Sequence, residues 1–259
     1  TGSIGWLYMS DRFVELPLAL FGISIATVML PKLSDYFNRS NIDAYNRTLN
    51  WGLKLGILIS FPTMLGLIIL SDPILITLLK YKEFTLNDVH MTSIALIAFS
   101  IGLPGMIGSK ILITNYYSRK DTKYPVKAAL IAVLCNFVLN IAFVVYLVKT
   151  DFNGAHIGLA VATSLSAYVN FFFLFKNAVK TKIFNMDQDI IFYILKSVIA
   201  TIVMSAFLLY FDLSKQAWMD YELVERVMNL FLLIIFSALI YFAFLYLFNI
   251  KPKNIKEQL

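Results

Sequence analysis

The run AALIAVLCNFVLNIAFVVYLV, residues 128–148, decides the fold class of this chain. It contains no charged side chain and has the length of about 20 residues that a helix needs to cross a bilayer. A membrane-spanning strand would be far shorter and would alternate polar with apolar residues. The run therefore predicts a transmembrane helix.

Similar apolar windows recur along the whole chain. Of its 259 residues, 59% are hydrophobic and 15% are charged, whereas an ordinary soluble domain is about 45–50% apolar and about 25% charged. We therefore predict an all-α fold, a polytopic transmembrane bundle of seven helices. The expected helices cover residues 4–30, 48–71, 88–116, 124–148, 156–178, 188–211 and 224–249.

Basic residues are concentrated in alternate connections between these helices. They occupy the first, third and fifth connections and the tail: Lys32, Arg39, Arg47, Arg119, Lys120, Lys123, Lys127, Lys176, Lys180, Lys182, Lys251, Lys253 and Lys256. Because cytoplasmic loops are enriched in Lys and Arg, residue 1 is expected outside and the C-terminus in the cytoplasm. The net charge of +6 thus indicates membrane orientation, and we expect no nucleic-acid partner.

Several expected helices are interrupted. Pro17 and Pro62 lie inside the first two, and the third contains Gly102-Leu-Pro-Gly105. Proline removes a backbone hydrogen bond, and transporters use such breaks at moving or ligand-binding elements. Plain helix packing is the alternative. Residues 31–50 mix basic with aromatic side chains and are interpreted as a short amphipathic segment at the cytoplasmic surface, or as loop packing.

Three charged residues lie within the first expected helix: Asp11, Arg12 and Glu15. On a helix Arg12 and Glu15 are i,i+3 neighbours, and Asp11 and Glu15 are i,i+4 neighbours, so we expect one cluster. Charges inside a membrane span usually face protein or a wet cavity and mark a function. Arg12 suits a phosphate or carboxylate because its planar fork donates two parallel hydrogen bonds. An internal ion pair that only orients helices is the alternative.

Other polar residues are weaker candidates. Asn136 and Asn140 are i,i+4 neighbours in the fourth expected helix, where amides join helices or coordinate a cation. Lys54 and Lys110 are expected to extend their ammonium groups to the cytoplasmic interface. The two histidines, His90 and His156, lack metal-ligand spacing, and the sequence contains no catalytic motif, so we expect neither a metal cofactor nor an enzyme.

Five stretches together resemble one family. They are residues 2–17 (GSIGWLYMSDRFVELP), 26–34 (ATVMLPKLS), 45–51 (YNRTLNW), 117–127 (YSRKDTKYPVK) and 154–165 (GAHIGLAVATSL). In this order and spacing they resemble the second half of the MurJ (MviN) lipid II flippases of bacterial cell-wall synthesis. That family belongs to the multidrug/oligosaccharidyl-lipid/polysaccharide exporter superfamily.

The resemblance implies fourteen helices in two lobes around a cationic cavity, with the seven helices of this chain as helices 8–14. Residues 1–180 would be most of the C-terminal transport lobe, five helices without the first helix of that lobe. Residues 181–259 would add two helices that form a groove for the lipid tail, and a cytoplasmic tail. This chain is then expected to need the missing N-terminal half in order to transport.

The resemblance also implies roles for the site residues. Arg12, with Asp11 and Glu15 beside it, would contact the pyrophosphate of undecaprenyl-linked disaccharide-pentapeptide. Asn136, Asn140 and Thr163 lie where some members bind sodium, so sodium or proton coupling is expected without a fixed cofactor.

The function that follows is translocation of lipid II to the outer leaflet of the bacterial cytoplasmic (inner) membrane by alternating access, in contact with membrane lipids. Two alternatives are an ion-coupled exporter of small cationic drugs from the same superfamily and a membrane scaffold for cell-wall enzymes that transports nothing. A cation exporter should present unpaired acids in its cavity, whereas the intramembrane cation here is Arg12.

Overall fold

The computed structural model describes residues 2–81, 83–150, 154–181, 184–211 and 213–250, and every regular element within these ranges is a helix. The predicted all-α fold is therefore confirmed. The elements are α1 (Ser3–Pro17), η1 (Leu18–Ile23), α2 (Ser24–Asn38), α3 (Ile42–Ile69), α4 (Ser71–Leu79), α5 (Leu86–Ser100), α6 (Leu103–Tyr117), α7 (Lys123–Lys149), α8 (Ile157–Lys180), α9 (Ile190–Leu209), α10 (Lys215–Asp220) and α11 (Leu223–Leu247).

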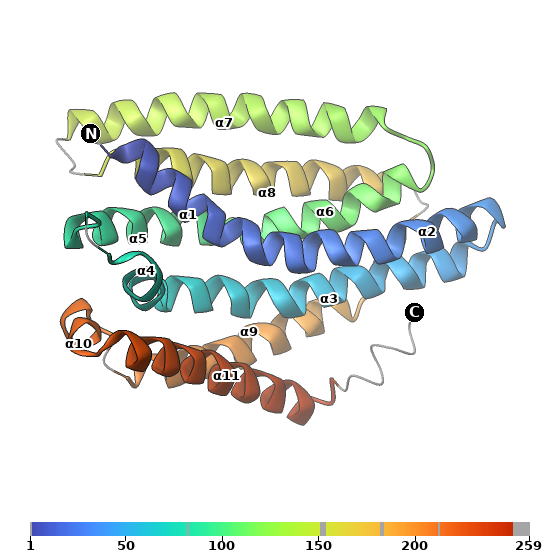
Figure 1. Ribbon diagram of the computed structural model, residues 1–259. Coiled ribbons are helices and arrows are strands. Elements are labelled where there is room, and N and C mark those ends of the chain that lie inside the picture. Colours follow the sequence, from blue (N-terminus) through green and yellow to red (C-terminus); the bar gives the residue numbers. More distant parts are fainter. Residues whose placement is uncertain (1, 82, 151–153, 182–183, 212, 251–259) are drawn as a thin grey trace.

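The long helices lie roughly side by side, with α3 near the centre (Figure 1). In this view α7 and α8 form one side of the bundle, α9 and α11 form the other, and α1, α2, α3 and α6 lie between them. The core follows the packing of α3 against α2, α6 and α9, where Tyr45 and Leu49 are fully buried. Helix α7 packs mainly on α8 and exposes apolar side chains such as Leu130 and Phe137, as a lipid-facing helix does.

The prediction of seven membrane spans is confirmed. Six continuous helical stretches of the described chain are long and apolar enough to cross a membrane, and the pair α5 and α6, bent by 43°, makes seven when it is counted as one broken span. The first span is longer than expected because α1, η1 and α2 form one helical stretch from Ser3 to Asn38.

Residues 31–50 are not the amphipathic surface segment that the sequence suggested. They contain the end of α2, a tight turn and the first turns of α3. Ser40 adopts a left-handed backbone with φ of 57°, and the side chain of Asn41 caps α3 by accepting a hydrogen bond from the N–H of Ala44 at 3.1 Å. The Ser-Asn turn thus separates two transmembrane helices directly.

Pro17 marks a change of helix type rather than a sharp break. The six residues that follow it, Leu18–Ile23, form a π-helix. Proline has no N–H for the preceding turn and its ring crowds the carbonyl four residues earlier, so the backbone widens here. Gly22 is the buried residue of this wider turn and packs beside Ile107 of α6.

The break between α5 and α6 is packed tightly against α8. A Cβ added to Gly102 would lie 2.8 Å from the Cα of Ser164, and one added to Gly105 would lie 3.0 Å from the backbone nitrogen of Tyr168. Ser164 donates a hydrogen bond to the carbonyl of Ala98 at 2.6 Å, and Tyr168 donates one to that of Ile101 at 2.7 Å. These contacts fit the helix-packing interpretation of this glycine motif, and a moving or ligand-binding role stays a prediction.

The helix ends form two groups at opposite ends of the bundle. The N-terminus, α4 and α10 lie at one end, and the α2–α3 turn and the α6–α7 connection lie at the other (Figure 1). The second end carries the basic residues of the first and third predicted connections. Four residues of the predicted basic clusters, Lys182, Lys251, Lys253 and Lys256, lie outside the described residues.

Candidate functional site

Arg12 lies on a solvent-exposed face of α1 between two side chains of the same helix. Its Nη1 atom lies 2.7 Å from Oε2 of Glu15, and its Nη2 donates a hydrogen bond to the hydroxyl of Tyr8 at 3.1 Å. The guanidinium carbon also lies 4.8 Å from the centre of the Tyr8 ring. The side chains of Arg12 and Glu15 remain 58% and 51% exposed. The arrangement offers an oriented cation to a ligand on this face.

The expected cluster is only partly formed. Arg12 and Glu15 pair as predicted, but among the described residues Asp11 forms no hydrogen bond or ion pair with Arg12. Side chains of a helix lean toward its N-terminus, so Arg12 reaches back to Tyr8 and Glu15 reaches back to Arg12. Asp11, the residue immediately before Arg12, lies on a different, half-buried side of the helix. Sequence analysis missed Tyr8, although its i−4 spacing from Arg12 was a usable signal.

The three residues of the expected cation cluster are brought together between α7 and α8. Asn136 donates from Nδ2 toward Oγ1 of Thr163 at 3.4 Å, and Asn140 donates to Oδ1 of Asn136 at 3.0 Å. Asn136 also approaches the hydroxyl of Ser166 at 3.4 Å, a residue that the sequence did not suggest. The Oδ1 atom of Asn140 is buried without a hydrogen-bond partner.

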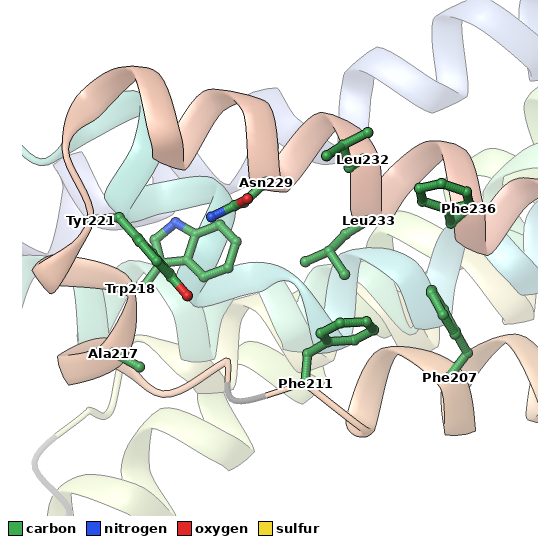
Figure 2. A pocket seen from close by; sticks show the side chains of 9 residues that line it. All are labelled: Phe207, Phe211, Ala217, Trp218, Tyr221, Asn229, Leu232, Leu233 and Phe236. Atoms are coloured by element: carbon green, nitrogen blue, oxygen red, sulfur yellow. The ribbon is translucent and has the colours of Figure 1, made fainter.

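An aromatic pocket of about 480 Å³ lies between α9, α10 and α11 (Figure 2). Its walls are mainly apolar and aromatic, with Asn229 as their one amide; they comprise Phe207, Phe211, Ala217, Trp218, Tyr221, Asn229, Leu232, Leu233 and Phe236. Trp218 is fixed in the wall because it is buried and donates from Nε1 to Oγ1 of Thr77 at 2.9 Å. The pocket lies within the helix pair that the sequence linked to a lipid tail.

The two membrane lysines differ from each other. Lys110 is exposed, and its reach to the cytoplasmic interface stays a prediction. Lys54 is only 5% exposed and forms an ion pair with Asp187 at 2.8 Å, so the expectation for Lys54 was wrong. Its partner lies 133 positions away in the sequence, beyond the reach of any spacing argument.

Comparison with known proteins agrees with this architecture. The family model described as "Lipid II flippase MurJ" matches residues 1–229. A probable lipid II flippase MurJ of Vibrio cholerae is 37% identical over 256 residues, which are 99% of this chain and 47% of the relative. Another from Haemophilus influenzae is 34% identical over 261 residues, 98% of this chain and 50% of the relative.

A solved structure of a lipid II flippase MurJ in an inward closed conformation superimposes with a TM-score of 0.76 at 30% identity. The match covers 96% of this chain and 47% of that one. The chain thus spans about half the length of the curated relatives that it matches. Because the family model covers most of the chain, this multi-pass helical membrane protein belongs to the lipid II flippase MurJ family.

Proposed function

We propose that this chain is the C-terminal half of a lipid II flippase, which moves the undecaprenyl-pyrophosphate-linked precursor of peptidoglycan to the outer leaflet by alternating access. The observation that carries the proposal is Arg12, a guanidinium held open to ligand on a membrane helix within the region that matches the family. A charge at such a position usually serves a ligand or a translocation path. In this reading residue 1 faces outward from the bacterial inner membrane and the C-terminus is cytoplasmic.

Arg12 contacts the pyrophosphate in this proposal. One N–H of Nη1 goes to Glu15 and one of Nη2 goes to Tyr8, and a guanidinium has five such donors. The remaining donors can bind phosphate oxygens side by side, as the planar fork allows. Glu15 and Tyr8 hold the group in place, and Asp11 contributes negative charge to the surroundings without a direct bond.

The lipid tail occupies the helix pair in residues 181–259, while residues 1–180 act as the transport lobe. The aromatic pocket supports this division because its lining is apolar and of the size that small hydrophobic ligands fill. Isoprenoid chains have no hydrogen-bonding groups, so burial of apolar area alone can hold them there. Residues 251–259, the proposed cytoplasmic tail, lie outside the described residues.

A monovalent cation such as sodium binds beside the transport lobe in this proposal. Oxygen atoms are the ligands that hard cations prefer, and this cluster holds the buried, unpartnered Oδ1 of Asn140 and the hydroxyl of Thr163, each joined to Asn136 through a hydrogen bond. Asn136 connects the two. The cluster contains no carboxylate, so it supplies part of a coordination shell and its affinity stays low.

Transport requires a second lobe that faces Arg12. The exposed face of α1 and η1 combines the Arg12 group with large apolar side chains, including Leu16, Leu20 and Phe21. A cavity that closes on either membrane side needs an opposite wall, and this face supports such a contact. Expression of residues 1–259 alone in cells depleted of their own flippase checks this point, and restored growth would contradict it.

The test of the substrate site is lipid II translocation by the chain combined with its partner lobe in vesicles. Arg12→Ala should reduce the initial rate by about tenfold or more, the factor expected for a lost hydrogen bond to a charged group. Arg39→Ala is the matched control, since Arg39 forms a similar i,i−4 pair with Asp35 at 2.9 Å, far from the site. Equal, measurable rates for wild type and Arg12→Ala, with equal insertion, would remove Arg12 from the substrate site, whereas no translocation by the wild-type protein would favour the scaffold alternative.

A further inference from the structure

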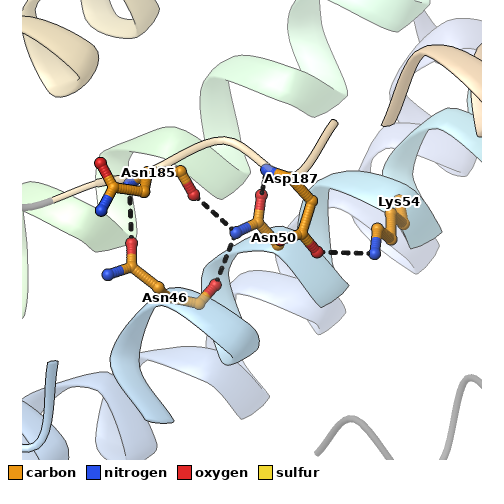
Figure 3. A network of polar contacts seen from close by, with 5 residues as sticks. All are labelled: Asn46, Asn50, Lys54, Asn185 and Asp187. Carbon is orange, nitrogen blue, oxygen red and sulfur yellow. Dashed lines mark hydrogen bonds and ion pairs between the residues drawn. The ribbon is translucent and has the colours of Figure 1, made fainter. Parts of the chain in front are cut away.

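Helix α3 presents a row of three polar side chains to the segment that leads into α9 (Figure 3). Asn46, Asn50 and Lys54 are spaced four residues apart and therefore lie along one side of the helix. Asn50 and Lys54 are only 2% and 5% exposed. Polar side chains buried this deeply need partners, and all three find them in residues 185–187.

The asparagines bind the backbone of this segment. Asn46 accepts a hydrogen bond from the N–H of Asn185 at 2.8 Å, and Asn50 accepts one from the N–H of Asp187 at 3.0 Å. Asn50 also donates from Nδ2 to the carbonyl of Asn185 at 2.8 Å. Residues 184–187 belong to no helix, so these backbone groups lack helical partners. The side-chain amides of Asn46 and Asn50 supply the missing partners at residues 185 and 187, much as the backbone of a neighbouring strand would.

Lys54 completes the row with a charge. Its Nζ lies 2.8 Å from Oδ2 of Asp187 and 5.1 Å from the ring centre of Tyr193 in the first turn of α9. The lysine side chain is 7% exposed and the aspartate side chain 49%. The cost of removing one partner is therefore unequal. Loss of Asp187 would leave a buried ammonium group without a counter-charge, whereas loss of Lys54 would leave a carboxylate that water can reach.

A second attachment lies further along the same helices. Tyr241 of α11 donates a hydrogen bond to the carbonyl of Leu58 in α3 at 2.6 Å, and its oxygen lies 2.9 Å from the hydroxyl of Ser197 in α9. These three residues join α3, α9 and α11 at one buried point. Together with the row of polar α3 residues that binds the segment before α9, this contact joins the helix pair to α3 at two levels.

We infer that Asn46, Asn50 and Lys54 form a latch on residues 185–187 that makes α9 and α11 move as one body with α3. The pocket between α9 and α11 is then carried by the lobe through any conformational change. Without the latch, the irregular segment before α9 would be a natural hinge, since among residues 184–187 the α3 contacts supply the partners of the Asn185 N–H, the Asn185 carbonyl and the Asp187 N–H.

Amide hydrogen exchange tests the latch itself. In Asn50→Ala, exchange at the amide of Asp187 should accelerate about fivefold, the factor for one lost hydrogen bond. Asn38→Ala, an exposed asparagine at the end of α2, is the matched control and should leave that rate unchanged. Unchanged exchange in Asn50→Ala would overturn the assignment of the latch.

Spin-label distances test the rigid coupling. Labels at Arg47→Cys in α3 and Leu247→Cys in α11, both exposed positions, are placed in a Cys135→Ala background. The latched chain should give one narrow distance distribution. Lys54→Met should broaden it, because this substitution removes the charge while the apolar methionine side chain still fills the space and lets the protein fold. Either of two results would overturn the inference: a broad distribution in the chain with the latch intact, or narrow distributions in both Asn50→Ala and Lys54→Met.

Discussion

The hydroxyl of Tyr241 donates a hydrogen bond at 2.6 Å to the carbonyl oxygen of Leu58, the acceptor that Pro62 leaves without a helical donor. In an unbroken helix the N–H of residue 62 would bind that carbonyl, but proline has no N–H. An unsatisfied carbonyl inside a membrane is costly, and here a side chain from α11, 183 positions away, satisfies it. A local defect in α3 thereby becomes an attachment between helices.

Tyr241→Phe should therefore destabilise the protein. The expected loss is about 1–3 kcal/mol of unfolding free energy, because a buried carbonyl loses its partner while the ring still fills its space. Reversible unfolding in detergent measures it. In a Pro62→Ala background, where residue 62 again supplies an N–H, the same substitution should cost clearly less. Equal costs in the two backgrounds would show that Tyr241 does not substitute for the missing donor.

Gly102→Ala should destabilise the bend between α5 and α6. A methyl group at this position would lie 2.8 Å from the Cα of Ser164, so a backbone must move, at a cost of about 1–3 kcal/mol. Gly66→Ala is the control, because nothing lies within 4 Å of its added Cβ and alanine is the better helix former. Thermal melts of the two variants should shift in opposite directions. A neutral Gly102→Ala would mean that α8 yields easily at this contact.

Tyr8→Phe and Tyr8→Leu should separate the two contacts that Tyr8 makes with Arg12. Phenylalanine keeps the ring beneath the guanidinium and removes the hydroxyl acceptor, whereas leucine removes both. Lipid II translocation by the complete transporter should fall by about twofold to fivefold in Tyr8→Phe and further in Tyr8→Leu. Tyr117→Phe, an exposed tyrosine at the far end of α6, should leave the rate unchanged. Full activity of Tyr8→Leu would remove Tyr8 from the site.

Asn140→Asp should create a stronger cation site. It places a negative charge where a buried oxygen already lacks a partner, beside Asn136, which in turn hydrogen-bonds to the hydroxyl of Thr163 across the helix interface. Sodium should then raise the melting temperature more than it does in the wild type, because a ligand that binds only the folded state stabilises it. Asn170→Asp, whose amide oxygen is also buried without a partner, is the control. The same sodium response in both variants would argue against a specific site.

Most of the helices were predictable from local pattern, and the details that connect them were not. The apolar run 128–148 became α7, and the i,i+3 spacing of Arg12 and Glu15 became an ion pair, because both depend only on neighbours along the chain. Residues 31–50 were misinterpreted because their charges and aromatic side chains mask two helix ends joined by a three-residue turn. Tyr8 was within reach of the same spacing argument that identified Glu15.

The sequence by itself determined the number of membrane spans, the location of the charged residues in α1 and the family to which the chain belongs. Each of these follows from hydropathy or from short motifs, which need no knowledge of distant contacts. Only the tertiary structure decided that Lys54 binds Asp187, that Tyr241 completes the helix at Pro62, and that an aromatic pocket lies between α9 and α11. The physical reason is that a buried polar group or a pocket wall is defined by whichever residues packing brings against it, and separation along the chain does not limit that choice.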